Sequence, residues 1–396
     1  MKISKLNVIE NLSLISFVLY FVFNFYDRSI ANIFLLITLF LCLVNYKNLY
    51  VTLKSNIRLV LSVIVFSIFI TLNGLYHNSP ISELDNYYRF LLLLPLILIS
   101  LNDSRMTVLL SLCAVVGLIH AFSYDAFYGI SLYPENIYRY AGTSNTAITY
   151  SNMCATLLMI CLYYIFYKKN YSHHLIFSTM IFLVLFMITE TRGPIIGLVL
   201  SLIYLSYSLR NSTKGSKNFM GPLLVLSIFL ISIILIPNPI GERMKLIGDI
   251  NFSEPLKIKN VSLRERAYYL NYAIDELKEH YISGVGPQNV TNRMQESLTK
   301  INVDNITPRD HVHNEFLDVS LKFGLLGLIL LFVIYFHLTQ SKNTEDKVLI
   351  NILMIMLIFS QMTQSHFSHH QAITFYIALF YLLQTRTSYS NKIQKN

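Results

Sequence analysis

The sequence predicts an all-α polytopic membrane protein. Of its 396 residues, 54% are hydrophobic and only 13% are charged, and the mean hydropathy is +0.50. This balance lies far from that of a soluble domain. Apolar runs of about 15 to 22 residues recur along nearly the whole chain, and each is long enough to cross a bilayer as a helix. Lipid offers no partner to unpaired backbone groups, so helices must form the fold.

The first apolar run follows residues Met1 to Glu10, and we interpret it as a retained anchor. It carries polar residues throughout, and no small-residue cleavage site follows it, so it does not fit a signal peptide. We expect the mature protein to keep its N-terminus.

About twelve transmembrane helices can be placed along the chain, and residues 1–396 are predicted to form a single transmembrane domain. The fourth helix is the weakest prediction, because Pro95 interrupts it. The predicted helices are centred near Phe17, Leu39, Val65, Leu96, Val115, Leu158, Leu183, Ile203, Ser227, Leu328, Ile355 and Ile377.

The basic residues predict the orientation in the membrane. One set of loops holds most of the lysines and arginines, while the alternate short loops hold little beyond Arg28, Arg89, Arg139 and Arg192. By the positive-inside rule, the basic loops and both termini are cytoplasmic. The net charge of +9 therefore reflects membrane orientation, and nucleic-acid binding is a poor interpretation.

One long loop, residues 237–312, is inserted between the ninth and tenth predicted helices and falls on the outer, periplasmic face. It contains a helix-like segment, Glu265 to Tyr281, followed by the helix breaker SGVGPQN. We expect an amphipathic helix that lies on the membrane surface or caps the bundle. The residues near its apolar face, at helical spacing, are Tyr269, Tyr272, Ala273 and Leu277.

Five arginines at helix ends or in the outer loops are candidates for anion binding. They are Arg192 in ETRGPIIG, Arg89 and Arg139 in two other outer loops, and Arg264 and Arg266 at the start of the loop helix. A charge at such a position is costly unless it meets water or a partner, although any one of them can be a solvated or snorkelling side chain. Arg264 and Arg266 cannot both face one site once the helix has begun, because residues two apart point roughly 200° apart.

His313 precedes an apolar run and is the candidate proton acceptor. A neutral imidazole is well suited to accept a proton near pH 7. At about 100° per residue, Gly324 and Gly327 fall near the azimuth of His313, so we expect the three to share a helix face that packs into the bundle. The alternative is an interfacial histidine without a catalytic role.

No metal or redox chemistry is expected. The segment SHFSHHQ spaces His366, His369 and His370 so that two imidazoles could share a metal ion. No acidic or cysteine partner is nearby, so we interpret them as loop or structural histidines. The cysteines lie inside apolar runs without pairing or metal-ligand spacing and are interpreted as small core residues. They are Cys42, Cys113, Cys154 and Cys161.

Three segments resemble the bacterial O-antigen ligases, within a superfamily that also holds O-antigen polymerases and protein O-oligosaccharyltransferases. HNEFLDVSLKFGLLG fits the family's pattern of His-Asn, nine residues, Gly, two residues and Gly, from His313 to Gly327. TETRGPIIG is similar to the family's Thr-Arg-Gly segment and aligns Arg192 with its first essential arginine. SLRERAYYLNYAIDELKEHYISGVG is similar to the family's loop helix, in which Arg266 aligns with the second and Arg264 is the competing register.

The resemblance implies an O-antigen ligase in the bacterial inner membrane, surrounded by membrane lipids. Such an enzyme transfers polysaccharide from undecaprenyl pyrophosphate to a sugar hydroxyl of lipid A-core at the periplasmic face. A metal ion or paired cations must stabilise the departing pyrophosphate. We see no paired acidic motif at an outer helix end, so Arg192 and Arg266 are assigned this role, without a metal or other cofactor.

The remaining site residues follow from the same resemblance. His313 would remove the proton of the acceptor hydroxyl, which attacks opposite the leaving group and inverts the anomeric carbon. Asn314 would hold the loop or the acceptor, and His311 would be a substrate contact or a solvated loop residue.

Two other functions stay open. An O-antigen polymerase uses the same donor but adds it to another lipid-linked glycan, and the pattern from His313 to Gly327 favours the ligase over it. A flippase or other transporter of lipid-linked oligosaccharide would place its charges along a central cavity between two related halves. Here the charges gather at one mouth, and no internal repeat is visible.

Overall fold

The computed structural model is helical and contains no strand in the part of the chain that it describes. The described residues are 5–128, 140–142, 144, 146–211, 219–225, 227, 256, 258, 261–300, 306–340 and 344–393.

Five helices among the described residues are long and apolar enough to cross a membrane. A sixth candidate is the pair α2 (Arg28–Val44) and α3 (Tyr46–Ser55), which bends by 89° at the break between them. The five are α4 (Ile57–Tyr76), α6 (Asp103–Tyr128, with the candidate span at Asp103–Ser123), α7 (Ala147–Phe166), α9 (Gly193–Arg210) and α14 (Glu315–Leu338).

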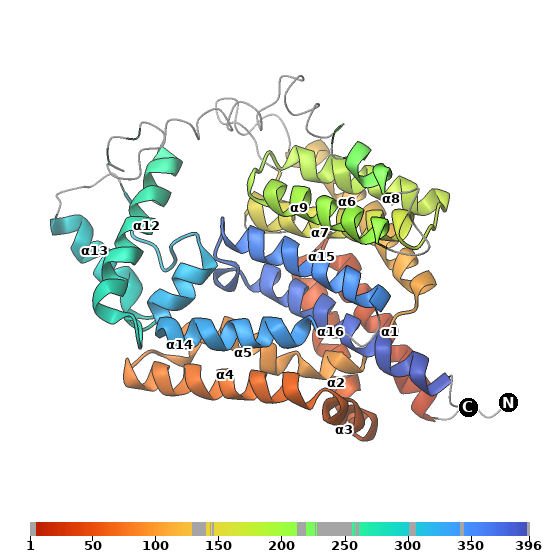
Figure 1. Ribbon diagram of the computed structural model, residues 1–396, viewed down its shortest axis with the longest axis horizontal. Helices are drawn as coiled ribbons and strands as arrows, with labels where there is room; N and C mark the ends of the chain where they lie inside the picture. Colours follow the sequence, from red (N-terminus) through yellow and green to blue (C-terminus); the bar gives the residue numbers. More distant parts are fainter. Residues whose placement is uncertain are drawn as a thin grey trace.

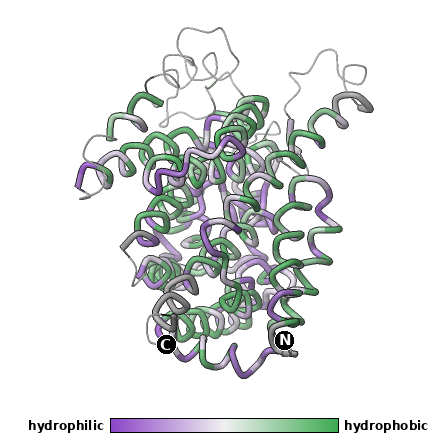
Figure 2. Tube along the Cα trace, turned by 90° about the vertical axis from the view of Figure 1, so that its right-hand side faces the viewer, coloured by the Kyte–Doolittle hydropathy of each residue, from purple (hydrophilic) through white to green (hydrophobic). Residues whose placement is uncertain are grey.

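Further apolar helices complete the bundle. α1 and α8 have shorter apolar stretches, and hydrophobic residues dominate the long helices along the trace (Figure 2). The predicted class, an all-α polytopic membrane protein, is confirmed, while the number of twelve transmembrane helices stays a prediction. The remaining helices of the bundle are α1 (Lys5–Phe23), α8 (His173–Ile188), α15 (Thr344–Gln361) and α16 (His370–Ile393).

The fourth predicted transmembrane helix is not one continuous helix. α5 (Asp85–Leu92) ends before Pro95, and the 3-10 turn η2 (Leu94–Leu98) contains that proline. Proline has no amide hydrogen and its ring crowds the preceding turn, so the α-helix ends there. The ninth predicted helix, near Ser227, lies largely outside the described residues.

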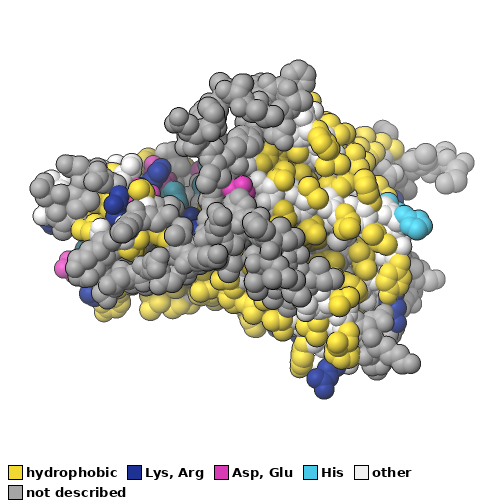
Figure 3. Space-filling view, turned by 90° about the horizontal axis from the view of Figure 1, so that it is seen from above, with side chains coloured by type: hydrophobic (Ala, Val, Ile, Leu, Met, Phe, Trp, Pro, Cys, Tyr) yellow, Lys and Arg dark blue, Asp and Glu magenta, His cyan; other side chains and the backbone are white. Residues whose placement is uncertain are grey.

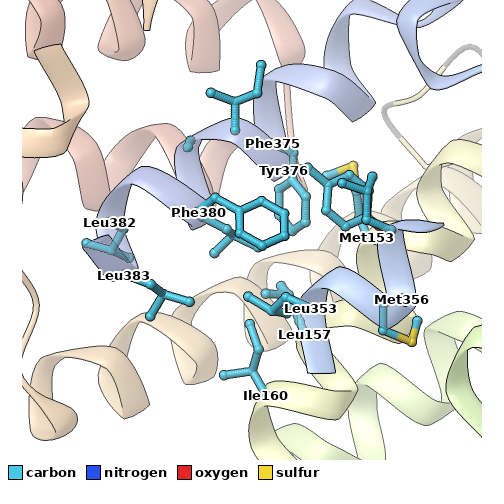
Figure 4. Packing of buried hydrophobic residues seen from close by; sticks show 14 of the residues in the cluster. Met153, Leu157, Ile160, Leu353, Met356, Phe375, Tyr376, Phe380, Leu382 and Leu383 are labelled. Atoms are coloured by element: carbon cyan, nitrogen blue, oxygen red, sulfur yellow. The ribbon is translucent and has the colours of Figure 1, made fainter. Parts of the chain in front are cut away.

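The core lies where α7, α15 and α16 meet. Within α7, 94% of the apolar window is buried, compared with 50% in α4 and 44% in α6, so α7 is the central helix. All four cysteines are buried and unpaired, as predicted. Figure 4 shows the side chains that pack between these helices, among them Met153 and Leu157 of α7, Leu353 and Met356 of α15, and Phe380 of α16.

The two ends of the bundle differ in character. α12 (Val261–His280) and α13 (Asn289–Lys300) stand at one end, whereas the start of α1 and the end of α16 lie at the other (Figure 1). Seen from above, charged side chains gather at the α12–α13 end, and hydrophobic side chains cover a broad surface of the bundle (Figure 3). This distribution suits a bundle in lipid with its loop helices in water.

The helix predicted in the long loop is present as α12. Its apolar face is buried against α13 and the start of α14, where Tyr269, Tyr272 and Ala273 join Met294 and Leu321 in a small second core. Of the two placements expected for this helix, the packing matches a cap on the bundle.

Candidate active site

A break in α14 brings the end of α12 against the start of α14. Gly324 has φ 68° and ψ −175°, which interrupts the helix. The segment after α12 lies across this break and is held there by two backbone hydrogen bonds. The amide of Val285 donates to the carbonyl of Leu321 (2.7 Å), and the amide of Leu325 donates to the carbonyl of Tyr281 (2.8 Å). A Cβ at Gly324 would lie 1.9 Å from the carbonyl oxygen of Ile282, so only glycine fits.

The expectation that His313, Gly324 and Gly327 share one face of a continuous helix is therefore wrong. His313 precedes the helix, and the helix is broken at Gly324, so counting 100° per residue does not apply across this segment. Gly327 does face a neighbouring helix, since a Cβ there would lie 3.4 Å from the ring of Phe69 in α4.

The residues before α14 hold His313 in a strained backbone conformation. His313 has φ +57°, a left-handed region that costs most L residues roughly 1–2 kcal/mol. Asn314 is the N-cap: its Oδ1 accepts from the amide of Leu317 (3.1 Å) and its Nδ2 donates to the carbonyl of Met362 (3.2 Å). Asn314 therefore ties the start of α14 to the turn that follows α15.

The imidazole of His313 lies between three side chains. Its Nδ1 is 3.0 Å from Oε1 of Gln364, and its ring centroid is 4.6 Å from that of His311 and 5.8 Å from that of Tyr269. A carbonyl oxygen only accepts hydrogen bonds, so Nδ1 carries the proton and Nε2 has the free lone pair. This is the tautomer that a general base at Nε2 needs.

Burial and nearby positive charge keep His313 neutral. Burial is the main cause that lowers its pKa to about 3, and His311, Arg266 and Arg309 lower it further, whereas the hydrogen bond that His313 donates to Gln364 raises it. Arg266 of α12 thus acts electrostatically on His313. The exposed Arg309, which the sequence did not single out, acts in the same way and also interacts with the Tyr269 hydroxyl.

Two other histidines, His311 and His369, form a connected group beside His313. His311 Nδ1 lies 2.7 Å from Oδ1 of Asp310, whose pKa is held well below its usual range by that contact. The ring of His369 is 5.8 Å from that of His311, and its Nε2 contacts the amide of Gln364. His366 is separate and buried, with Nε2 2.7 Å from Ser360 Oγ.

Among the described residues, no group of three or more His, Cys, Asp or Glu side chains could hold a metal ion.

Arg192 lies at the start of α9, beside the turn that holds His313. It occupies the N-cap position and is half-buried. The next residue, Gly193, is so close to the turn that a Cβ on it would lie 2.7 Å from Oγ1 of Thr363. Thr363 precedes Gln364, so the structure brings the first turn of α9 to the loop cluster around His313.

The remaining predicted arginines have different positions. Both Arg264 and Arg266 lie on α12, but Arg264 is not among the charges that act on His313, and its Nε is buried without a hydrogen-bond partner among the described residues. The charges that act on His313 therefore favour Arg266. Arg89 contacts the start of α16 instead, through Thr374 (2.8 Å), and Arg139 lies outside the described residues.

An ion pair buried below His313 anchors this end of α14. Nζ of Lys322 lies 2.8 Å from Oδ2 of Asp318, and Oδ1 of Asp318 accepts from the amide of Val312 at 3.3 Å. Both side chains are buried. The pair thus ties the loop before His313 to the helix after it, a link that the sequence did not indicate.

Comparison with known proteins finds a family whose model matches the part of the chain that contains these residues. Residues 175–332 match the family model described as O-antigen ligase, a segment that includes Arg192, Arg266 and His313. A protein of Haemophilus influenzae, described as uncharacterized, is 26% identical over 349 residues, which cover 81% of this chain and 84% of that protein.

Proposed function

Since this chain belongs to the O-antigen ligase superfamily by its match over residues 175–332, we propose that it is the ligase itself. It transfers a polysaccharide from undecaprenyl pyrophosphate to a sugar hydroxyl of lipid A-core, at the periplasmic face of the bacterial inner membrane. The superfamily consists of glycosyltransferase-like membrane enzymes, and the donor, the acceptor and the direction of transfer are our proposal.

One observation carries the proposal: His313 is a neutral imidazole whose Nδ1 is held by Gln364, with the charge of Arg266 beside it. In the proposed reaction, Nε2 of His313 accepts the proton of the acceptor hydroxyl. The hydroxyl oxygen attacks the anomeric carbon as the bond from that carbon to the pyrophosphate oxygen breaks. The pyrophosphate leaves with the electron pair of that bond, and Arg192 and Arg266 stabilise its charge.

Donor binding would also prepare the base. The low pKa of His313, about 3, arises from burial and from the cations around it, and an imidazole of such low basicity is a weak proton acceptor. The negative charge of a bound pyrophosphate favours the imidazolium and raises this pKa. The base therefore gains strength only when a donor is present to react.

A reconstituted transfer assay tests the proposal. The purified protein in detergent is mixed with the lipid-linked polysaccharide and lipid A-core, without ATP or an ion gradient, and glycosylated lipid A-core is detected by gel shift. We expect transfer, and we expect His313→Ala to abolish it while its circular dichroism and melting stay those of a folded protein. Transfer by the folded His313→Ala variant would overturn the mechanism.

A deletion strain separates the ligase from the polymerase. Loss of a ligase leaves long polymer on the undecaprenyl carrier and bare lipid A-core. Loss of a polymerase instead leaves single repeat units attached to the core, a result that would replace our proposal.

A further inference from the structure

A cavity lined by charged, polar and apolar side chains lies apart from the residues around His313. It has a volume of about 290 Å³ and lies between α1, α2, α5 and α16. Two arginines line it, Arg28 at the first position of α2 and Arg89 in α5. The mechanism above uses neither of them.

The two arginines differ in how they are held. Arg89 is fixed by Asp85 (3.1 Å), Asn86 (3.1 Å) and Thr374 (2.8 Å), so its guanidinium is already oriented. The half-buried Arg28 makes no side-chain hydrogen bond or ion pair with any residue that the structure describes. Asp85 offsets one positive charge, so the cavity keeps one guanidinium available for an anion.

The apolar part of the cavity includes Leu35 and Leu36 of α2, the helix that also carries Arg28. Leu36 lines the cavity and is also 66% exposed. Ile33 and Phe40 are similarly exposed, and their spacing places them on the same face of α2 as Leu36. An anionic head group at Arg28 can therefore leave its hydrocarbon chain along this face, in lipid.

The cavity and His313 lie on two sides of one histidine pair. His370 lines the cavity, while its neighbour His369 lies 5.8 Å from His311 and contacts Gln364, the partner of His313. His369 and Gln364 thus connect the cavity to the proposed base.

We propose that this cavity binds the phosphate group of a membrane lipid, between Arg28 and Arg89, with the hydrocarbon chain along Leu36. The lipid is a substrate of the reaction at His313, a step that rests on the proposed function. Phosphate is carried by the polyprenyl donor and by lipid A alike, and the experiment below distinguishes these two sources.

A binding measurement that does not depend on glycan transfer tests the site first. Purified full-length protein in detergent is titrated with dodecyl phosphate, and with dodecanol and inorganic phosphate as comparisons, by isothermal titration calorimetry. We expect dodecyl phosphate to bind and Arg28→Gln to weaken the affinity by about tenfold or more. Arg28→Lys keeps the positive charge but loses the planar guanidinium, so its affinity for dodecyl phosphate should lie between those of the wild type and Arg28→Gln. The matched control is Arg58→Gln, an exposed arginine at the start of α4, which should bind as the wild type does.

The outcomes separate the explanations. Binding that Arg28→Gln keeps and Arg266→Gln loses would overturn the site, because the probe would then occupy the proposed donor position. Equal affinity for inorganic phosphate would overturn the lipid assignment. Melting curves show whether the Arg28 variants are folded.

The transfer assay then identifies the lipid. Arg28→Gln should raise the KM for the lipid that occupies the cavity, donor or acceptor, and leave the KM for the other unchanged. If both KM values stay unchanged while dodecyl phosphate binding is lost, the link between this cavity and the reaction fails, although the proposed function does not.

Discussion

Nδ1 of His313 lies 3.0 Å from Oε1 of Gln364, a residue 51 positions away in the sequence. The same amide contacts His369 on its other side. Gln364 therefore selects the tautomer of His313 and links it to a second histidine. Metal-ligating and catalytic histidines are commonly oriented through their second ring nitrogen in this way.

Changing Gln364 should alter the pH dependence of transfer as well as its rate. Gln364→Leu removes the acceptor at Nδ1, and we expect a loss of roughly 100-fold, the scale of general-base catalysis. Gln364→Glu keeps an acceptor and adds a negative charge, which favours the imidazolium and raises the pKa of His313. Activity is lost on acidification as the base becomes protonated, so the acidic limb of the pH–rate profile should move to higher pH. A profile that does not move would leave Gln364 with a structural role only.

His313→Gly should separate stability from activity. The residue has φ +57°, which glycine adopts without strain, so His313→Gly should be more stable than His313→Ala by about 1 kcal/mol, although both lose the contacts of the imidazole. It has no imidazole, so transfer should be abolished. Thermal melting in detergent and the transfer assay measure the two effects, with His313→Asn as a second variant because asparagine also tolerates this conformation. A glycine variant that is no more stable than the alanine variant would contradict the strain argument.

The two arginines of α12 should respond differently to lysine. Arg266 acts on His313, and a lysine cannot bind phosphate oxygens bidentately, so Arg266→Lys should reduce kcat/KM by about tenfold or more. Arg264→Lys should reduce it much less. We expect the same large loss for Arg192→Lys. Because arginines rather than a metal ion are proposed to stabilise the pyrophosphate, transfer should also survive a chelator such as EDTA. Full activity of both Arg192→Lys and Arg266→Lys would remove the argument for bidentate binding.

Gly324→Ala should strongly destabilise the protein. The added Cβ would lie 1.9 Å from the carbonyl oxygen of Ile282, and the residue has φ +68°, so both backbone segments would have to move. We expect a loss of several kcal/mol, visible as a lower melting temperature and a poor folded yield. The control is Gly197→Ala in α9, where the nearest atoms to the new Cβ, all from Met356, begin at 3.4 Å. Equal melting of the two variants would mean that the break does not depend on glycine.

The buried pair of Asp318 and Lys322 should behave as a unit. Lys322→Met leaves the Asp318 carboxylate buried without its cation, which costs roughly 3–5 kcal/mol. The double variant Asp318→Asn with Lys322→Met removes both charges and should recover much of that loss. A double-mutant cycle by denaturation measures the coupling. If the two single losses simply add, the ion pair seen at 2.8 Å does not couple the residues.

The residues themselves were enough to predict the helical membrane class, the helix in the long loop and the buried cysteines. Each of these depends on local hydrophobicity and helical spacing, which a stretch of sequence already contains. The motif around His313 likewise indicated the family, because the spacing of His313, Asn314, Gly324 and Gly327 is a property of one short segment.

Only the packing of distant segments decided how that motif is built. The position of Gln364 beside His313, the loop that crosses α14 at Gly324, and the cavity between Arg28 and Arg89 each join segments far apart in the chain. Counting residues around a helix failed at Gly324 because a backbone contact from another segment breaks the helix there. Such contacts depend on how the whole bundle folds, and no single stretch of sequence specifies them.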